Sequence, residues 1–195
     1  LSLSLEKANT QVVACFNYTG TPYVKNRLLP EVVYAYGLKD AIQKGYLKRA
    51  VVNGYTNSKS KEFLKIVIDD FWNYYSENRY EDLLPKIAFF ASSIEELEKE
   101  LKPNIEGILS EKNIPMDKIL VNVGDEKITS NDDIREFNNL DKPSSDKQFI
   151  LLVNKGKEGW NCRSLFAVAL HRQPKSKIFV LQATMRCLRQ ITEIQ

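Results

Sequence analysis

The sequence predicts an α/β domain with a parallel sheet over residues 82–195. Three observations support this fold class. Short and almost continuously apolar runs at residues 86–91, 119–123 and 149–153 are typical of strands that are buried on both faces. Segments with helical spacing separate these runs, as in βαβ units, which build parallel sheets covered by helices. The composition, with 43% hydrophobic and 27% charged residues among 195, is normal for a folded chain and sufficient for a core.

Ahead of this domain, the sequence predicts an entry strand followed by a mostly helical connector. The apolar run QVVACF at residues 11–16 precedes a Thr-Gly-Thr-Pro turn at residues 19–22, which is typical of a buried strand that ends in a loop. Residues 38–46 are expected to form a short helix that ends near Gly45, and residues 47–52 a short strand.

A longer amphipathic helix is predicted over residues 59–79. Apolar residues recur there at spacings of three and four, which places them on one helical face. These residues are Phe63, Ile66, Val67, Phe71 and Tyr74. The aromatic residues of this segment could stack nucleobases, but we favour packing in the core.

Within the domain, capping patterns predict where helices begin. Ser93 has Glu96 three residues later, which is the pattern of a capping box. The helix that follows should reach about residue 111, with Pro103 interrupting it. The remaining predictions are a helix capped by Ser130 or Asn131 and containing Ile134 and Phe137, a strand at residues 165–170 and a closing helix at residues 177–190.

Composition also limits the classes of function. The formal net charge is +3, and residues 147–189 are basic, which suggests a phosphate or nucleic-acid partner or an ordinary solvated surface. The 3 cysteines are widely spaced and odd in number, as expected for reduced thiols in a cytoplasmic protein. No apolar run approaches the length of a membrane span, so we expect no membrane partner. The chain starts without Met, and we interpret it as a piece of a longer protein.

Several chemistries lack the residues that they need. The single histidine, His171, has no evident partner for a nucleophile–histidine system, and we favour a structural role for it at a strand end. No Gly-x-Gly-x-x-Gly follows a strand, and the sequence contains no Gly-x-x-x-x-Gly-Lys-Ser/Thr phosphate loop. This chain alone therefore has nothing to cradle a triphosphate and its Mg²⁺.

Two features of the basic part remain as candidate sites. Gly156 and Gly159 lie three apart directly after the strand at residues 149–153, at the sheet edge where ligands of open α/β sheets bind; an ordinary turn is the alternative. Arg186 and Arg189 are also three apart, so we expect them to share one helix face and to suit the oxygens of a triphosphate. A solvated or salt-bridged basic face is the alternative.

Taken together and in order, four segments resemble the motifs of superfamily 2 helicases. Residues 19–22 resemble motif III, and KIAFFASS at residues 86–93 resembles motif IV. FILLVNKGKEGWN at residues 149–161 resembles motif V, and FVLQATMRCLR at residues 179–189 resembles motif VI. With LPEVVYAYGLKDAIQKGYLK and HRQPKSKIF as flanks, the similarity is greatest to the restriction subunit of type III restriction enzymes. Two positions depart from the pattern: Met185 stands where the family has Gly, and Asn161 where it usually has Asp.

The resemblance implies a division of the chain and a role for it in a motor. Residues 1–24 would be the last strand and motif III of a first RecA-like domain, residues 25–81 a connector, and residues 82–195 the second, helicase C-terminal RecA-like domain. ATP and Mg²⁺ would be bound mainly by the first domain, while the second supplies arginine fingers. The implied residues are Arg189 and Arg186 for catalysis, Gln182, Gly159 and Asn161 for nucleotide binding, Thr19 and Thr21 for coupling, and Ser92, Asn154 and Lys155, with Lys175 and Lys177 as weaker candidates, for DNA contacts.

The resemblance also implies partners and leaves alternatives. The partners would be DNA, the first RecA-like domain of the same polypeptide, and a methyltransferase or specificity subunit. The whole protein would be an ATP hydrolase in a restriction endonuclease, whereas this chain alone should be inactive. The alternatives are a degenerate RecA-like module that binds nucleic acid or protein without catalysis, and a superfamily 2 helicase outside restriction. The motor interpretation requires Arg186 and Arg189 outside buried salt bridges and toward the carboxyl ends of the strands, and a position away from those ends would contradict it.

Overall fold

The computed structural model describes two compact units, Leu1–Tyr36 and Gly37–Gln195. In the first unit, β1 (Tyr23–Val24) and β2 (Arg27–Leu28) pair as antiparallel strands. The strand expected at residues 11–16 lies outside the described residues. The structure describes residues 19, 23–24, 27–28, 32, 34–124, 129–153, 160–172 and 177–192.

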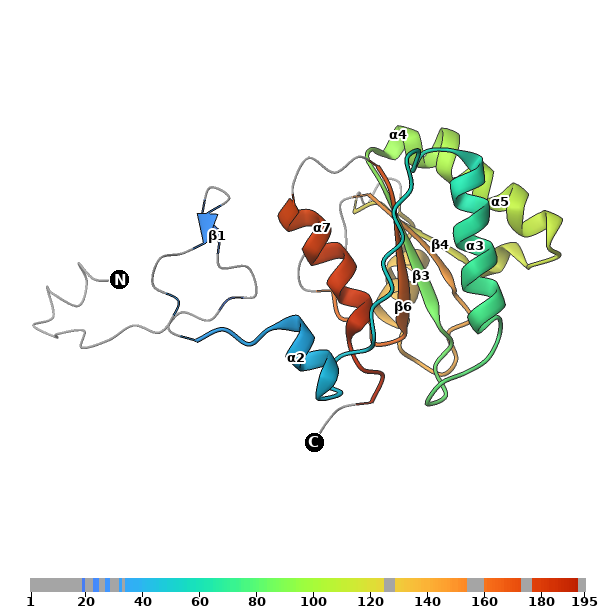
Figure 1. Cartoon of the computed structure of the whole chain (residues 1–195). Helices are drawn as coiled ribbons and strands as arrows, with labels where there is room; N and C mark the ends of the chain where they lie inside the picture. The colour runs from blue at the N-terminus through green and yellow to red at the C-terminus, as the bar shows by residue number, and fades with distance from the viewer. Residues whose placement is uncertain are drawn as a thin grey trace, which may run out of the picture. The chain divides into compact units, whose positions relative to one another are not determined.

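A four-stranded, all-parallel sheet forms the centre of the second unit (Figure 1). Its order is β4-β5-β3-β6, so β4 and β6 are the edge strands. The predicted α/β class with a parallel sheet is therefore confirmed. The strands are β3 (Lys86–Ala91), β4 (Ile119–Asn122), β5 (Phe149–Leu152) and β6 (Leu165–His171).

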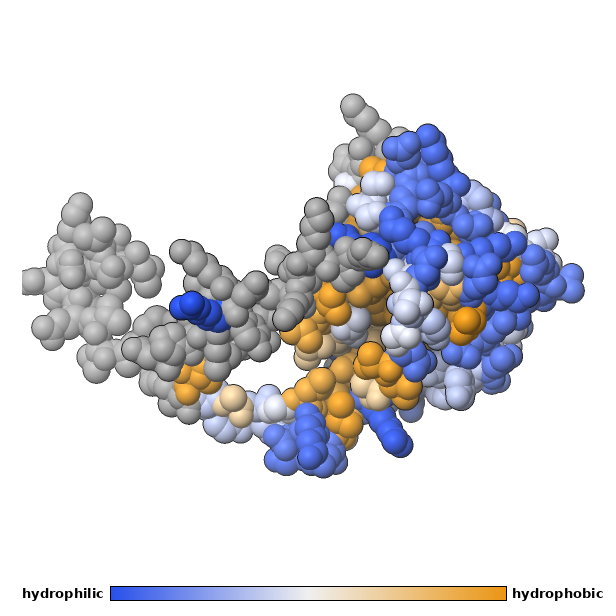
Figure 2. Space-filling model, turned by 45° about the horizontal axis from the view of Figure 1, so that its top comes forward, coloured by the Kyte–Doolittle hydropathy of each residue, from blue (hydrophilic) through white to orange (hydrophobic). Residues whose placement is uncertain are grey.

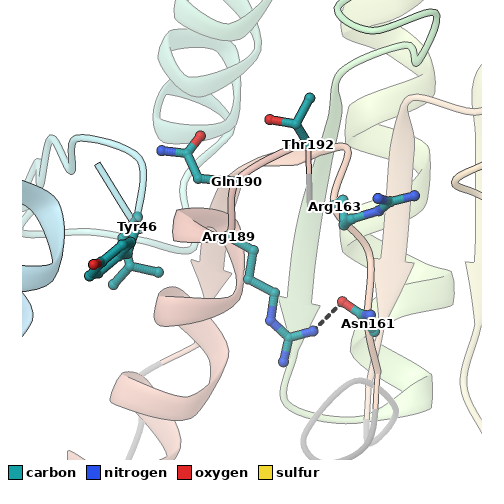
Figure 3. Close-up of a pocket in the computed structure, with 7 residues that line it drawn as sticks. Tyr46, Asn161, Arg163, Arg189, Gln190 and Thr192 are labelled. Carbon is teal, nitrogen blue, oxygen red and sulfur yellow. Dashed lines mark hydrogen bonds between the residues drawn. The ribbon is translucent and has the colours of Figure 1, made fainter. Parts of the chain in front are cut away.

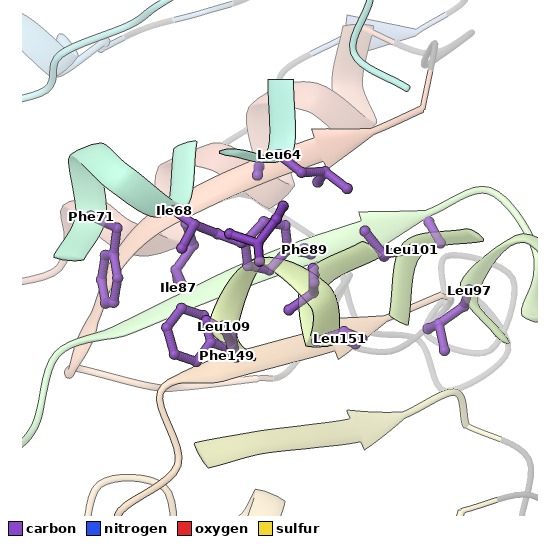
Figure 4. Close-up of a cluster of buried hydrophobic side chains, with 14 of the residues drawn as sticks. Leu64, Ile68, Phe71, Ile87, Phe89, Leu97, Leu101, Leu109, Phe149 and Leu151 are labelled. Carbon is purple, nitrogen blue, oxygen red and sulfur yellow. The ribbon is translucent and has the colours of Figure 1, made fainter. Parts of the chain in front are cut away.

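One face of the sheet packs against α3 (Lys61–Tyr75) and α5 (Lys102–Glu111), as Figure 4 shows. Ser60 caps α3 by accepting a hydrogen bond from the amide of Phe63 at 3.1 Å. The buried face of α3 consists of Phe63, Leu64, Ile68 and Phe71. The predicted face was partly wrong, because Ile66 and Tyr74 are exposed.

The helix predicted to be interrupted by Pro103 is interrupted just before that residue, by a wider helical turn. The chain runs from α4 (Ile94–Glu96) through a π-helical turn, η1 (Leu97–Leu101), into α5. Proline has no amide hydrogen and its ring crowds the carbonyl four residues earlier, and a π-turn relieves both constraints. Ser93 accepts from the amide of Glu96 at 3.1 Å, so half of the capping box is present. The other half is shifted by one residue, since Glu96 accepts from the amide of Ser92.

The opposite face of the sheet is covered by α6 (Asn131–Asn138) and α7 (Lys177–Thr184). Ser130 caps α6, as predicted, by accepting from the amide of Asp133 at 3.0 Å. The ring of Phe179 on α7 meets that of Phe90 edge-on, with 5.8 Å between centroids. Figure 2 shows hydrophobic residues gathered around α7, whereas the side formed by α3 to α5 is mostly hydrophilic.

Two predicted elements near the connector and the C-terminus are wrong. The helix α2 (Leu38–Gln43) forms as expected, but residues 48–55 form no strand, and only Leu47 makes an isolated bridge, to Arg189. The closing helix stops at Thr184 and continues as a 3₁₀ turn, η3 (Met185–Leu188). The Thr184 hydroxyl donates back to the Val180 carbonyl at 2.6 Å, a local bond that competes with continued helix. Among the described helices, none combines the length and apolar character that a membrane span requires.

Candidate functional site

Three segments that are far apart in the sequence meet beside the start of β6 (Figure 3). Arg189 donates through Nη1 to the side-chain oxygen of Asn161, and Arg186 donates to the carbonyl oxygen of Trp160. Leu47 from the connector pairs with Arg189 in an antiparallel bridge. The structure thus brings together the predicted residues of the segments that resemble motifs V and VI.

This meeting point lies at the amino edge of the sheet, where the strands begin, and not at the carboxyl edge. Trp160 and Asn161 precede β6, and the helix α7 starts beyond the carboxyl end of β6 and returns along the sheet (Figure 1). The expected position near the carboxyl ends of the strands is therefore wrong. The shared helix face is wrong as well, because Arg189 has an extended backbone, with φ −62° and ψ 137°. Each guanidinium instead reaches the loop that leads into β6.

The amino edge carries an open hollow of about 440 Å³, which we call the arginine hollow. Arg189 and Asn161 are exposed there, and Arg163 also lines the hollow, with its side chain directed away from Arg189 in Figure 3. The guanidinium fork of Arg189, with amide and hydroxyl groups nearby, suits the oxygens of a polyphosphate. The lining residues are Tyr46, Leu47, Asn161, Arg163, Arg189, Gln190 and Thr192.

The loop before β6 is fixed by the carboxylate of Asp141, which lies shortly after α6 in the sequence. Asp141 accepts hydrogen bonds from the amides of Arg163 and Ser164 at 2.7 and 2.9 Å, and from the Ser164 hydroxyl at 2.6 Å. Burial by itself would raise the pKa of Asp141, but these hydrogen bonds together outweigh burial and hold the pKa below its usual range. The carboxylate therefore stays ionised and keeps the backbone of the loop in place.

The carboxyl edge is organised around a buried carboxylate instead. Glu96 pairs with the Lys59 ammonium at 2.5 Å and lies 3.5 Å from Nδ1 of His171. The Ser92 hydroxyl donates to the same carboxylate. We call Lys59, Ser92, Glu96 and His171 the carboxylate cluster. A DNA phosphate at Ser92, as the resemblance implies, would have to compete with Glu96 for this hydroxyl.

The other predicted site residues divide into two groups. Gln182 lies half-buried on α7, Lys177 begins that helix, and Thr19 is exposed in the first unit. Their roles stay predictions. The remaining ones, Thr21, Asn154, Lys155, Gly159 and Lys175, lie outside the described residues.

Tyr46, Arg163 and Asp141 also belong to the site, although no sequence pattern predicted them there. Arg163 follows Asn161 by two residues, so its proximity in the sequence was a usable signal. Tyr46 and Asp141 approach the loop only through the tertiary fold, and no local pattern marks them. Within the described ranges, no group of three or more His, Cys, Asp or Glu residues could hold a metal ion.

The fold and the hollow define an all-parallel α/β domain with an arginine-lined surface at its amino edge. No protein-family model matches the chain, and no curated protein matches it significantly.

Proposed function

We propose that this chain is part of the motor of a DNA-dependent ATPase of the superfamily 2 helicase type, as in the restriction subunit of type III restriction enzymes. The observation that carries the proposal is the contact between Arg189 and Asn161. These residues are 28 positions apart and come from the two segments with the most specific motif resemblance. The all-parallel sheet with helices on both faces is compatible with a RecA-like domain.

The amino-edge position contradicts the form of the motor interpretation in which the arginines act at the carboxyl ends of the strands, and the proposal depends on a different arrangement. The rule that ligands bind at the carboxyl edge applies to a sheet that holds its own ligand. This chain has no phosphate loop, so the nucleotide would be held by another domain, and the amino edge would face it. Leu181 and Met185, which are exposed on and after α7, would offer apolar surface for contact with that domain.

In this proposal Arg189 is the arginine finger. Its guanidinium is exposed and would place positive charge on the transferring phosphoryl group, where arginine fingers act in other nucleotide hydrolases. The neutral amide of Asn161 orients the guanidinium without neutralising its charge. Arg186 holds the Trp160 carbonyl, so its part would be to fix the loop as well as to approach the phosphates.

The test is the ATPase activity of the longer polypeptide that contains both this chain and a phosphate-loop domain. We expect ATP hydrolysis that duplex DNA stimulates, because superfamily 2 motors couple the two. The isolated 195-residue chain should show no turnover, with or without DNA. DNA-stimulated hydrolysis by the isolated chain, or none by the longer polypeptide, would contradict the proposal.

A second candidate function is a degenerate module that binds nucleic acid or protein without hydrolysis. Met185 favours it, because a side chain stands, 38% exposed, where the family has Gly. Asn161 favours it too, since it lacks the usual negative charge. Under this candidate the longer polypeptide binds duplex DNA but hydrolyses no ATP. A nuclease domain elsewhere in that polypeptide would favour a restriction enzyme over another superfamily 2 helicase.

A further inference from the structure

The connector residue Lys48 touches both segments that form the arginine hollow. Its backbone amide donates to the carbonyl of Leu188 at 2.6 Å, directly before Arg189. Around this bond, Leu47 pairs with Arg189, and the Gln190 side chain donates to the Gly45 carbonyl at 2.9 Å. The backbone next to Arg189 is thus held by the connector.

The side chain of Lys48 reaches the other segment. Its ammonium donates to the carbonyls of Arg163 and Leu165, at 3.0 and 3.1 Å. The same ammonium lies 3.9 Å from the centre of the Phe166 ring, within range of a cation–π interaction. One residue therefore ties the loop before β6 to the segment that carries Arg189.

We propose that Lys48 is a positioning residue that holds the backbone of Arg189 at a fixed place beside the loop that leads into β6. The inference rests on the proposed function, in which the guanidinium of Arg189 acts on phosphate oxygens. This action requires the Arg189 guanidinium at a fixed place, since a displacement of about 1 Å can cost 100-fold in a positioned site. Asp141 fixes the loop before β6, and Lys48 ties the segment that carries Arg189 to this loop.

Stability alone does not explain a lysine at this position. Burial lowers the pKa of Lys48 to about 8, although nearby Cys187, Cys162 and Asp141 act in the opposite direction. An apolar side chain would cover Phe166 without this desolvation penalty, and such replacements are often neutral or stabilising. Methionine, however, donates no hydrogen bond to the two carbonyls. The specific contribution of the ammonium is the link between the segments.

The experiment measures the binding of sodium tripolyphosphate to the full chain at pH 7 by titration calorimetry. The variants are Lys48→Met, Lys48→Arg, Arg189→Gln and the double variant Lys48→Met/Arg189→Gln. We expect Arg189→Gln to weaken binding about tenfold, through loss of a charge-assisted hydrogen bond. Lys48→Met should also weaken binding about tenfold, and Lys48→Arg less than about threefold, because arginine keeps donors for the carbonyls.

The double variant separates positioning from a general structural role. If Lys48 acts by placing Arg189, the Lys48→Met change should weaken binding less than about twofold once Arg189 is absent. If the effects of the two single variants instead multiply fully in the double variant, the inference is overturned. Wild-type affinity in Lys48→Met would overturn it as well. Unchanged affinity in Arg189→Gln would instead contradict the proposed function of the hollow. Should Lys48→Met fail to fold, Lys48→Leu takes its place, and unfolding in urea checks that each variant is native.

Discussion

The charged side chains at the two edges of the parallel sheet differ in their surroundings. At the carboxyl edge, the carboxylate cluster surrounds the buried Glu96 with Lys59, Ser92 and His171. At the amino edge, the arginine hollow leaves Arg189 exposed beside the neutral Asn161. In the described part of the chain, the first arrangement is closed and internally balanced, whereas the second presents positive charge to the outside. In the proposed function, ligand binding falls to the amino edge, while the carboxylate cluster stabilises the fold.

The largest effect is expected from a buried lysine that supports the amino edge. Lys86 is fully buried, donates to the Leu84 carbonyl at 2.8 Å, and its pKa is lowered to about 8, mainly by burial. Between about pH 8 and 10.5, the unfolded chain therefore binds more protons than the folded one. The free energy of unfolding should rise with pH over this range. The Lys86→Met variant should lose this gain, which is on the order of 3 kcal/mol.

Urea unfolding at pH 7 and pH 10.5 measures this contribution as the difference between wild type and Lys86→Met. Taking the difference cancels the alkaline titration of other buried groups, including Cys162, whose pKa burial raises to about 12. A difference that does not change with pH would mean that Lys86 is not the buried cation described above.

The next effect should come from breaking the carboxylate cluster. Glu96→Gln keeps the shape of the side chain but removes the charge that faces Lys59 and His171. We expect a loss of about 2 kcal/mol in the free energy of unfolding, since Glu96 is buried although Lys59 is half-exposed. The matched control is Glu95→Gln, an exposed carboxylate paired with Lys99, which should change stability by less than about 0.5 kcal/mol. Equal losses in both variants would contradict the role of the cluster.

A smaller effect is predicted for the pH dependence that His171 introduces. Burial lowers the pKa of His171, and this outweighs the neighbouring Glu96 carboxylate, which acts to raise it. Because the unfolded state takes up the proton first, the free energy of unfolding should fall as the pH drops below about 6.5, by at most about 1.4 kcal/mol per unit. Denaturation of wild type and His171→Gln between pH 7.5 and 5.5 checks this, and the variant should have the flatter profile.

The sheet could be predicted from the sequence, whereas the shape of the site could not. The strands β3 and β5 are buried on both faces, so their apolar runs identified them directly. The end of α7 depends on the Thr184 back-bond and on the pairing of Leu47 with Arg189, and the sequence gives no local sign of the latter. Arg189 was therefore predicted to lie on this helix, whereas in the structure the helix ends at Thr184.

The candidate site shows the same limit. Asn161 and Arg189 were identified as members of one site, because each belongs to a recognisable pattern, and they are in contact. The edge of the sheet was predicted incorrectly, because that prediction applied the rule for a domain that holds its own ligand. Tyr46 and Lys48 join the site through long-range contacts, which periodicity and capping patterns do not describe.

The central claim is that the exposed guanidinium of Arg189 acts on a nucleotide held by another domain. Its most direct test is the DNA-stimulated ATP turnover of the longer polypeptide with Arg189→Ala, compared with Arg135→Ala. Arg135 is also an exposed arginine, on α6, where it pairs with Asp132 at 3.1 Å. We predict a loss of about 1,000-fold for Arg189→Ala, as for other arginine fingers, and turnover within about twofold of wild type for Arg135→Ala. Full turnover in Arg189→Ala would contradict the claim.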